Sequence, residues 1–311
     1  MKAVCIHGFG GLDVLKVEDV GRPEPGPGEA LIRTQAIGVN PVDWKTCAGR
    51  GVANMIQLAF PFVPGWDISG VVEAVGPGVS RFAPGDAVFG LVRFPQPGSA
   101  YAEYVAAPVD HLAVKPHSLD HLQAAALPCV ALTAWQALVE CARLQPGQKV
   151  LIHAAAGGVG HVALQLARQL GAFVIGTASR RNADFVIECG ADQFVDYQAA
   201  RFEACVAGVD VVIDPIAGDT RDRSWQIIKP GGMLVAIQGP ASVEAAARHG
   251  VRAEHLLVRP HAAQLAALAG LVDDGRLRPC VSAVFSLEQA QTALEFIRAG
   301  HTRGKIVLNV H

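Results

Sequence analysis

The chain has 311 residues, of which 51% are hydrophobic and 17% are charged. This length suits two domains, and this composition supports a large core and excludes extensive disorder. The net charge of −2 gives no reason to expect binding to nucleic acid or to an anionic membrane surface, and no apolar run reaches the roughly 18 residues that predict a transmembrane helix.

The N-terminal sequence and the cysteine content both bear on the cellular location of the protein. The opening sequence MKAVCIHGFG is typical of a strand rather than a signal peptide, because it lacks a longer apolar stretch and a cleavage site. Seven cysteines are scattered along the chain, their number is odd, and no C-x-x-C pair occurs. This usage favours free cysteines, mostly in the core, and a cytoplasmic location.

Residues 1–120 are predicted to be all-β. Short apolar runs such as 31–39 and 68–75 are separated by clusters of proline and glycine, the longest of them at 23–28. Turns at this density are typical of a small barrel.

A strand, a glycine turn and a helix are predicted between residues 149 and 171. The strand at 149–153 is rich in branched residues, and apolar positions recur at helical spacing from Val159. The turn between them has the form A-x-G-x-x-G and suits a dinucleotide, whose phosphates would lie at the helix N-terminus. The alternative is that the glycines serve only to pack a tight turn. The candidate cofactor contacts here are Ala155, Gly157, Gly158, Val159 and Gly160.

Alternating strands and helices surround this turn, in the βαβ rhythm of a doubly wound sheet. Strands are predicted at 173–178, 209–213 and 233–237, and helices at 122–126, 133–141 and 220–228, with Pro128 separating the first two helices. Near the end of the chain, Ser286 and Gln289 form a capping box before a helix. A last strand at 305–310 is expected to pair with the N-terminal barrel.

Five motifs follow one another along the chain. They are N-P-V-D-W-K at 40–45, P-G-W-D-I-S-G at 64–70, G-D-A-V at 85–88, the turn at 155–160 and R-G-K-I-V-L at 303–308. Together they resemble the zinc-independent quinone oxidoreductase branch of the medium-chain dehydrogenase/reductase superfamily, over nearly the whole chain. The resemblance implies an α/β protein: a GroES-like β-barrel catalytic domain at 1–120, completed by 265–311, and a Rossmann doubly wound parallel sheet that binds NADPH at 121–264.

The resemblance also bears on zinc. The zinc alcohol dehydrogenases of this superfamily carry a cysteine at the place of Asn40 and a His-Glu pair at the place of Trp66 and Asp67. Here an amide and an indole replace two ligands, and only Cys129 falls where such enzymes place a third. Because one cysteine cannot make a three-ligand catalytic site, we expect no metal.

The cofactor preference is predicted from the end of the second strand of the sheet. NAD enzymes of this fold place an acidic residue there that binds the ribose 2′-OH. Here the strand leads into Ser179, Arg180 and Arg181, and a hydroxyl with two guanidiniums suits a 2′-phosphate. We therefore expect NADPH rather than NADH. The alternative is that both arginines are ordinary solvated charges.

Three more residues are candidate cofactor contacts. By resemblance, Tyr197 lies along the phosphate-bearing adenosine ribose, and Thr133 lies near the nicotinamide or serves as a simple helix cap. Lys305 either approaches the cofactor or is a strand-edge lysine.

Four residues are candidates for the chemistry. Asn40 is expected to face the nicotinamide and to donate to a substrate carbonyl or the nicotinamide ribose, unless it only satisfies turn backbone. Lys45 stabilises an oxyanion or relays a proton, or is simply exposed. Asp43 pairs with Lys45 or caps a turn, and Trp66 lines the substrate cleft or belongs to the core. Related reductases often carry a tyrosine near Lys45, and this chain has none before Tyr101.

Without a metal, hydride transfer needs an acceptor that is already electrophilic. The expected activity is NADPH-dependent hydride transfer to a quinone or α,β-unsaturated carbonyl. The alternatives are a zinc-type alcohol dehydrogenase and an NADPH-binding sensor with little turnover. The resemblance further implies a homodimer that pairs sheet edges near 233–237.

Overall fold

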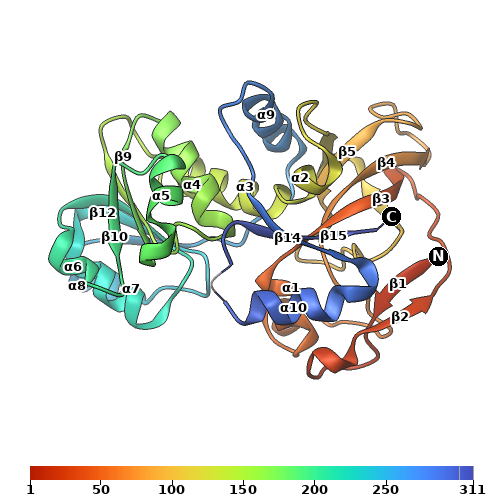
Figure 1. The fold of residues 1–311 in the computed structure, drawn as a ribbon, viewed down its shortest axis with the longest axis horizontal. Helices are drawn as coiled ribbons and strands as arrows, with labels where there is room; N and C mark the ends of the chain where they lie inside the picture. Colours follow the sequence, from red (N-terminus) through yellow and green to blue (C-terminus); the bar gives the residue numbers. More distant parts are fainter. Residues whose placement is uncertain (301, 311) are drawn as a thin grey trace. The chain divides into compact units, whose positions relative to one another are not determined.

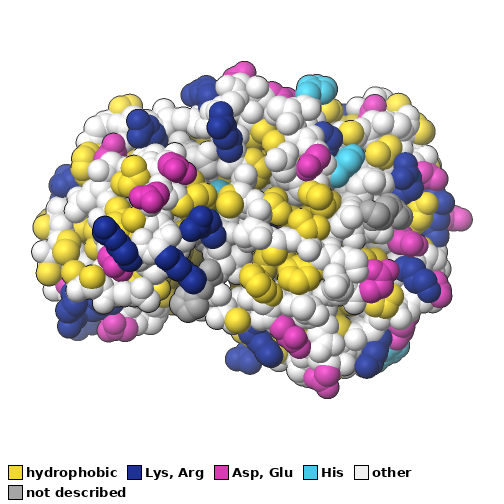
Figure 2. Space-filling view, viewed as in Figure 1, with side chains coloured by type: hydrophobic (Ala, Val, Ile, Leu, Met, Phe, Trp, Pro, Cys, Tyr) yellow, Lys and Arg dark blue, Asp and Glu magenta, His cyan; other side chains and the backbone are white. Residues whose placement is uncertain are grey.

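The computed structural model describes residues 1–300 and 302–310, which divide into two compact units (Figure 1). Unit 1 comprises Met1–Leu132 and Arg259–His311, and unit 2 comprises Thr133–Val258. Figure 2 shows acidic and basic side chains interspersed over the face in view. No helix within the described ranges is long and apolar enough to span a membrane.

Unit 1 contains the first seven strands and the last two. Its strands are β1 (Lys2–Cys5), β2 (Lys16–Asp19), β3 (Glu29–Val39), β4 (Asp67–Val75), β5 (Ala87–Leu91), β6 (Tyr104–Pro108), β7 (Leu112–Val114), β14 (Val281–Ser286) and β15 (Lys305–Asn309). Its helices are α1 (Pro41–Cys47), α2 (His121–Ala125), most of α3 (Pro128–Trp135), α9 (Ala262–Asp273), α10 (Ala290–Arg298) and the short 3-10 turns η1 (Leu12–Val14), η2 (Gly51–Asn54), η3 (Val109–His111) and η7 (Leu287–Gln289).

The main sheet of unit 1 is organised around β3, which is apolar along most of its length and pairs with β4, β6 and β15. Within the described residues the strand order is β14-β15-β3-β4-β5-β7, with β6 also on β3. The antiparallel pairing of β15 with β3 confirms that the end of the chain returns to the N-terminal unit. This pairing sets Ile306 opposite Val39 and so brings Lys305 beside the start of α1.

Unit 2 carries the predicted parallel sheet. Its strands are β8 (Lys149–Ile152), β9 (Phe173–Ala178), β10 (Gln193–Asp196), β11 (Val209–Asp214), β12 (Ile228–Ala236) and β13 (Arg252–His255). Its helices are α4 (Gly158–Gln169), α5 (Ala183–Glu188), α6 (Phe202–Cys205), α7 (Gly218–Ser224), α8 (Val243–Arg248), the π-helix η4 (Gln136–Cys141) and the turns η5 (Arg180–Asn182) and η6 (Trp225–Ile227).

The sheet of unit 2 runs in the order β10-β9-β8-β11-β12-β13, and all its described pairings are parallel. The order reverses at β8, as in a doubly wound fold. The expected sheet edge near 233–237 is wrong, because β12 is paired on both sides and β13 forms that edge.

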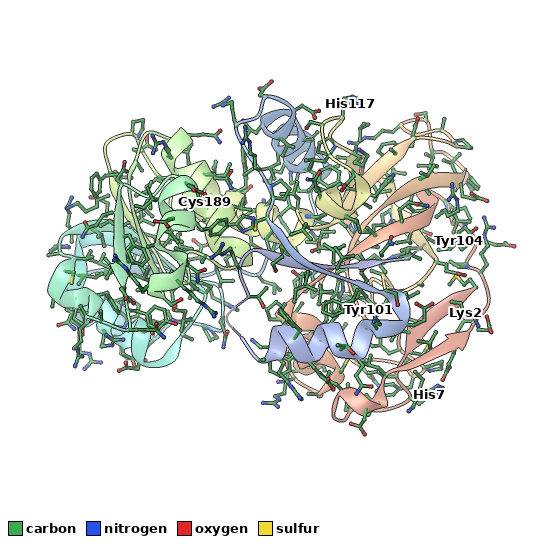
Figure 3. The ribbon with its side chains drawn as sticks, viewed as in Figure 1. Lys2, His7, Tyr101, Tyr104, His117 and Cys189 are labelled. Atoms are coloured by element: carbon green, nitrogen blue, oxygen red, sulfur yellow. The ribbon has the colours of Figure 1, made fainter. Side chains whose placement is uncertain are left out.

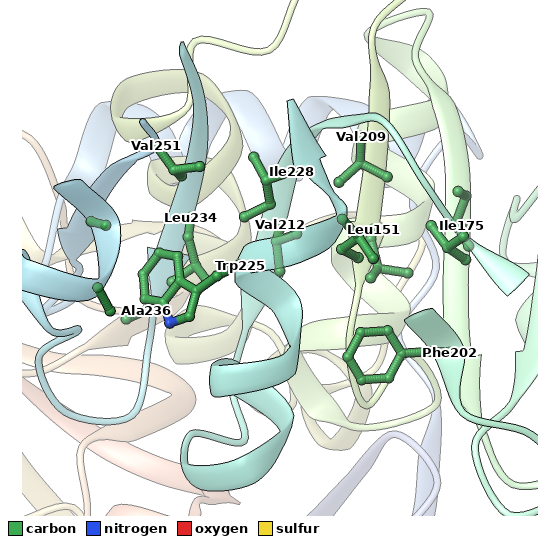
Figure 4. Close-up of a cluster of buried hydrophobic side chains, with 14 of the residues drawn as sticks. Leu151, Ile175, Phe202, Val209, Val212, Trp225, Ile228, Leu234, Ala236 and Val251 are labelled. Carbon is green, nitrogen blue, oxygen red and sulfur yellow. The ribbon is translucent and has the colours of Figure 1, made fainter. Parts of the chain in front are cut away.

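A cluster of buried side chains covers one face of this sheet (Figure 4). Leu151, Val212 and Leu234 come from neighbouring strands and pack with Phe202 and Trp225. Each large apolar side chain buried in this way stabilises the fold by about 1.5–3 kcal/mol. On the other face, helices α4 and α5 pack against β9.

Three boundaries differ from the sequence prediction. Helix α2 packs on β3 and β4, so the chain leaves unit 1 only after Leu132 rather than at residue 120. Two separate helices are present as predicted, but α3 begins at Pro128 itself rather than at Thr133, since proline lacks only an N–H that the first helical turn cannot use. Unit 1 resumes at Arg259, ahead of the predicted 265.

Candidate functional site

The glycine turn of unit 2 has the geometry of a close strand-to-helix connection. Ala154 has a φ of 48°, and Gly157 precedes the first residue of α4. A Cβ on Gly160 would lie 2.3 Å from the Ala154 carbonyl oxygen and 2.7 Å from the Cα of Ala155. Only glycine fits at that position, and α4 can therefore pack directly on the turn.

The N-terminus of α4 offers donors to an anion. The helix begins at Gly158, one residue before the predicted start, and Val159 is its second residue. The first N–H groups of a helix have no carbonyl within the helix to receive them, and the helix dipole favours negative charge there. Gly157 leaves the approach to these donors open, with only the Ala154 oxygen 3.2 Å from where its Cβ would be. This arrangement fits a pyrophosphate.

His153, just before the glycine turn, forms side-chain hydrogen bonds with β9 and α7. It is 1% exposed, with Nε2 2.9 Å from Ser224 Oγ and Nδ1 3.1 Å from Thr177 Oγ1. Because the Ser224 hydroxyl donates to the Thr220 carbonyl, Nε2 of His153 must carry the proton and Nδ1 must accept. Burial lowers the pKa of His153 to about 4, which keeps the ring neutral.

The predicted 2′-phosphate residues lie together at the carboxyl ends of two neighbouring strands. Ser179 directly follows β9, is buried, and accepts a 3.2 Å hydrogen bond from Asn182 Nδ2. Arg180 and Arg181 follow it and are exposed. Tyr197 follows β10, is 48% exposed, and donates its N–H to the Ala178 carbonyl.

Thr133 is buried within α3, five residues after the helix begins at Pro128. The alternative prediction that it caps a helix is therefore wrong.

In unit 1, Asn40 joins three segments that are distant in sequence. It lies between β3 and α1 and is 3% exposed. Its Nδ2 donates to Asp67 Oδ2 at 2.8 Å and to the Gly38 carbonyl at 3.4 Å, and its Oδ1 accepts from Lys305 Nζ at 2.5 Å. The side chain therefore does more than satisfy turn backbone, and its amide hydrogens already have acceptors within unit 1.

Lys305 and Asp67 form a buried ion pair beside Asn40. Their charged atoms lie 3.6 Å apart, and the side chains are 3% and 0% exposed. Lys305 also donates to the Val39 carbonyl at 2.8 Å, and Asp67 Oδ1 accepts the Cys129 N–H at 2.8 Å. Burial raises the pKa of Asp67, and the Lys305 charge opposes that rise. The strand-edge alternative for Lys305 is wrong, because β15 lies between β14 and β3.

Asp43 stabilises the first turn of α1 from its third position and makes no ion pair with Lys45. Its Oδ2 accepts the Asn40 N–H and the Tyr101 hydroxyl, both at 2.8 Å. Within the described residues Oδ1 has no hydrogen-bond partner. Burial raises the pKa of Asp43 to about 7, and burial also raises the pKa of Tyr101 well above its usual value. Figure 3 shows Tyr101 inside unit 1, away from the peripheral Lys2 and His7.

The last two candidates differ in accessibility. Lys45 is partly exposed on α1, with Nζ 5.8 Å from the centre of the Trp44 ring. Burial, and then the nearby Arg50 charge, lower the pKa of Lys45. Trp66 is 1% exposed and donates its indole N–H to the Gln96 carbonyl at 2.7 Å, so the structure favours the core role over the lining of a cleft.

Asn40, Asp43 and Lys305 are joined by hydrogen bonds to two further residues, Asp67 and Tyr101, to which the sequence analysis gave no role. Asp67 lies inside a quoted motif, next to Trp66, so attention to the whole motif would have found it. No sequence pattern points to Tyr101, because its partner Asp43 lies 58 residues away. Among the described residues there is no group of three or more His, Cys, Asp or Glu side chains that could hold a metal ion.

Fold and site together define an oxidoreductase with a GroES-like N-terminal domain and a Rossmann-like sheet. Residues 26–117 match the family model of the alcohol dehydrogenase GroES-like domain, and residues 189–308 match that of the zinc-binding dehydrogenase. A quinone oxidoreductase from Sus scrofa is 33% identical, over 99% of this chain and 97% of its own length. The chain belongs to the quinone oxidoreductase branch of the medium-chain dehydrogenase/reductase superfamily.

Solved structures agree with this assignment. The quinone oxidoreductase of Coxiella burnetii is 40% identical, with a TM-score of 0.94 over 100% of this chain and 99% of that one. The Escherichia coli quinone oxidoreductase in complex with NADPH is 25% identical, with a TM-score of 0.90 over 100% of both chains.

Proposed function

We propose that this oxidoreductase uses NADPH to reduce a quinone or α,β-unsaturated carbonyl without a metal ion. The observation that carries the cofactor assignment is the set of side chains at the ends of β9 and β10. Ser179, Arg180 and Arg181 stand where NAD enzymes of this fold carry an acidic residue, and the exposed guanidiniums suit a phosphate. The NADPH complex of the Escherichia coli relative supports the same cofactor.

Each unit has a distinct part in the proposed reaction. In unit 2, the first N–H groups of α4 bind the pyrophosphate, and Arg180 and Arg181 bind the 2′-phosphate. When bound, NADPH supplies the hydride. In unit 1, the ammonium of Lys305 and the amide of Asn40 form a rigid polar cluster held by Asp67.

Lys45 is the proposed group for the substrate oxygen. An enone or quinone that accepts a hydride gains negative charge on its oxygen, and a nearby ammonium stabilises that charge. Partial burial lowers the pKa of Lys45, so its proton is easier to give up than that of a fully solvated lysine. We propose that the Lys45 ammonium holds its proton close to the substrate oxygen as negative charge develops there.

The proposal is tested with a panel of quinones and enones, each assayed with NADPH and with NADH. We expect oxidation of NADPH by at least one compound class, and a fall of about tenfold or more in the NADPH/NADH ratio of kcat/KM when Arg180 and Arg181 are both changed to Ala. Arg248→Ala, an exposed arginine on α8, is the matched control and should keep the ratio.

Two results would count against the proposal. An unchanged NADPH/NADH ratio of kcat/KM in the variant with both arginines changed to Ala would contradict their proposed binding of the 2′-phosphate. NADPH binding without oxidation across the whole panel would favour a cofactor-binding sensor over a reductase.

A further inference from the structure

The Arg221 guanidinium is buried in unit 2, and each of its three nitrogens has an acceptor. Nε donates to Asp214 Oδ2 at 2.5 Å, and the two terminal nitrogens donate to the carbonyls of Pro240 and Gln238 at 2.8 and 2.7 Å. The side chains of Arg221 and Asp214 are 8% and 0% exposed. Taking two charges out of water is costly unless the hydrogen bonding is complete, so this pair is stable in one defined geometry.

These contacts join two loops. Asp214 is the last residue of β11, and Gln238–Pro240 follow β12, the parallel neighbour of β11. Both loops therefore leave the sheet at its carboxyl edge. The other Asp214 oxygen accepts the N–H groups of Ile216 and Ala217 at 2.9 and 3.0 Å, which shapes the loop after β11.

The carboxyl edge of the sheet is where a bound dinucleotide would lie, which suggests a function for the Arg221 contacts. In doubly wound sheets a dinucleotide lies across the carboxyl ends of the strands where the strand order reverses, here between β8 and β11. The proposed 2′-phosphate residues occupy the β9 side of that point. The nicotinamide half must then extend over the ends of β11 and β12, where Arg221 holds the two loops.

We propose that Arg221 is a positioning residue that fixes the Gln238–Pro240 loop as the wall against the nicotinamide half of the cofactor. The inference rests on the proposed function, because it requires NADPH in unit 2. Gly239, with a φ of 68°, gives this loop a conformation that few other residues adopt. Without the guanidinium, two loop carbonyls lose their donor and the loop can rearrange.

The test uses the double variant Arg221→Met with Asp214→Asn. The single change at Arg221 would leave a buried carboxylate without its cation and risk unfolding, whereas Asp214→Asn removes that charge and keeps a side-chain oxygen for the Ile216 and Ala217 N–H groups. Dissociation constants are measured by calorimetry for NADPH and for 2′,5′-ADP, which lacks the nicotinamide half. We expect NADPH to bind about tenfold to a hundredfold more weakly, because the released loop must be ordered again when the cofactor binds, and 2′,5′-ADP to bind as in the wild type.

Arg223→Met is the matched control on the same helix. Its guanidinium pairs with Glu203 and Asp219 rather than with the loop carbonyls, so both ligands should bind normally. Equal weakening of both ligands in the double variant, or no weakening of either, would overturn the inference. A wild type that binds NADPH but not 2′,5′-ADP would overturn the placement of the two halves, and one that binds neither would overturn the proposed function itself.

Discussion

The Tyr101 hydroxyl donates a 2.8 Å hydrogen bond to Asp43 Oδ2, and neither side chain is exposed. The same oxygen accepts the backbone N–H of Asn40, whose side chain is bonded to Asp67. Asn40 is thus held between two buried carboxyl groups, one on its backbone and one on its amide. Its orientation depends on both.

Asp43 should make stability fall as the pH rises. Its pKa is raised from 3.8 to about 7, so between these values the folded state binds more protons than the unfolded state. Its contribution is fully present below pH 3.8 and is lost as the pH rises to about 7. We expect Asp43→Asn to remove a slope of up to about 1.4 kcal/mol per pH unit, measured by urea unfolding across this range. A variant with the wild-type pH dependence would contradict the prediction.

Tyr101→Phe extends the same test. The tyrosine hydrogen bond lowers the pKa of Asp43, so its removal should raise that pKa further. The fall in stability should then continue to a higher pH than in the wild type.

His153 should make stability fall as the pH falls, which is the opposite of the effect of Asp43. Burial lowers its pKa from 6.5 to about 4, so in this range the unfolded state binds more protons and stability is lost as the pH falls. The charges of Asp214 and Arg223 act on the ring in opposite directions. His153→Gln should be less sensitive to acid than the wild type in unfolding experiments between pH 4 and 6.5. Equal acid sensitivity of the two proteins would show that His153 does not titrate as described.

Two helical glycines should respond oppositely to alanine. Gly160→Ala places a Cβ 2.3 Å from the Ala154 oxygen and should destabilise the protein by about 1–3 kcal/mol. Gly270, within α9, has no atom within 4 Å of its Cβ position, and Gly270→Ala should stabilise by about 0.5–1 kcal/mol. Thermal unfolding distinguishes these outcomes, and a tolerated Gly160→Ala would refute the close packing of α4 on the turn.

The buried ion pair of Lys305 and Asp67 should show energetic coupling. Lys305→Met alone leaves the Asp67 carboxyl without its cation and should cost about 3–5 kcal/mol of unfolding free energy. Adding Asp67→Asn should recover much of this loss, which a double-mutant cycle measures. The exposed pair of Lys2 and Asp19 is the control, and Lys2→Met should change stability little. Additive effects of the two buried changes would argue against a direct interaction.

Lys45 is expected to act on turnover rather than on cofactor binding. Lys45→Ala should lower kcat about tenfold or more while leaving the dissociation constant of NADPH unchanged, because the lysine belongs to unit 1 and the cofactor residues to unit 2. Lys16→Ala, an exposed lysine on β2, is the control. Wild-type turnover in Lys45→Ala would remove the proposed role.

Local patterns anticipated much of the fold. The alternation of apolar runs with proline and glycine predicted the strands of unit 1, and the helical spacing after Val159 predicted α4. These predictions succeed because turn chemistry and side-chain periodicity act within a few residues. The start of α3 was placed at Thr133 although proline suits the first helical position, where it stands in the structure. The edge of the sheet was misjudged because it depends on which strand pairs beside β12.

Partners across long separations were not predictable. The sequence marked Asn40 as a candidate, but its contact with Lys305 spans 265 residues and depends on the pairing of β15 with β3. Arg221 carries no motif, and only the adjacency of β11 and β12 brings the two loops within reach of one guanidinium. Trp66 could line a cleft or fill a core until its burial was known.

The sequence by itself determined the glycine turn, the absence of an acidic residue after β9 and the membership of the superfamily, because each is a property of neighbouring residues. Only the tertiary structure decided the partners of the buried charges. A charged or polar group away from water is stable only when it has hydrogen-bond partners, and the partners of Asn40, Lys305 and Arg221 come from strands and loops that meet after the sheets have formed.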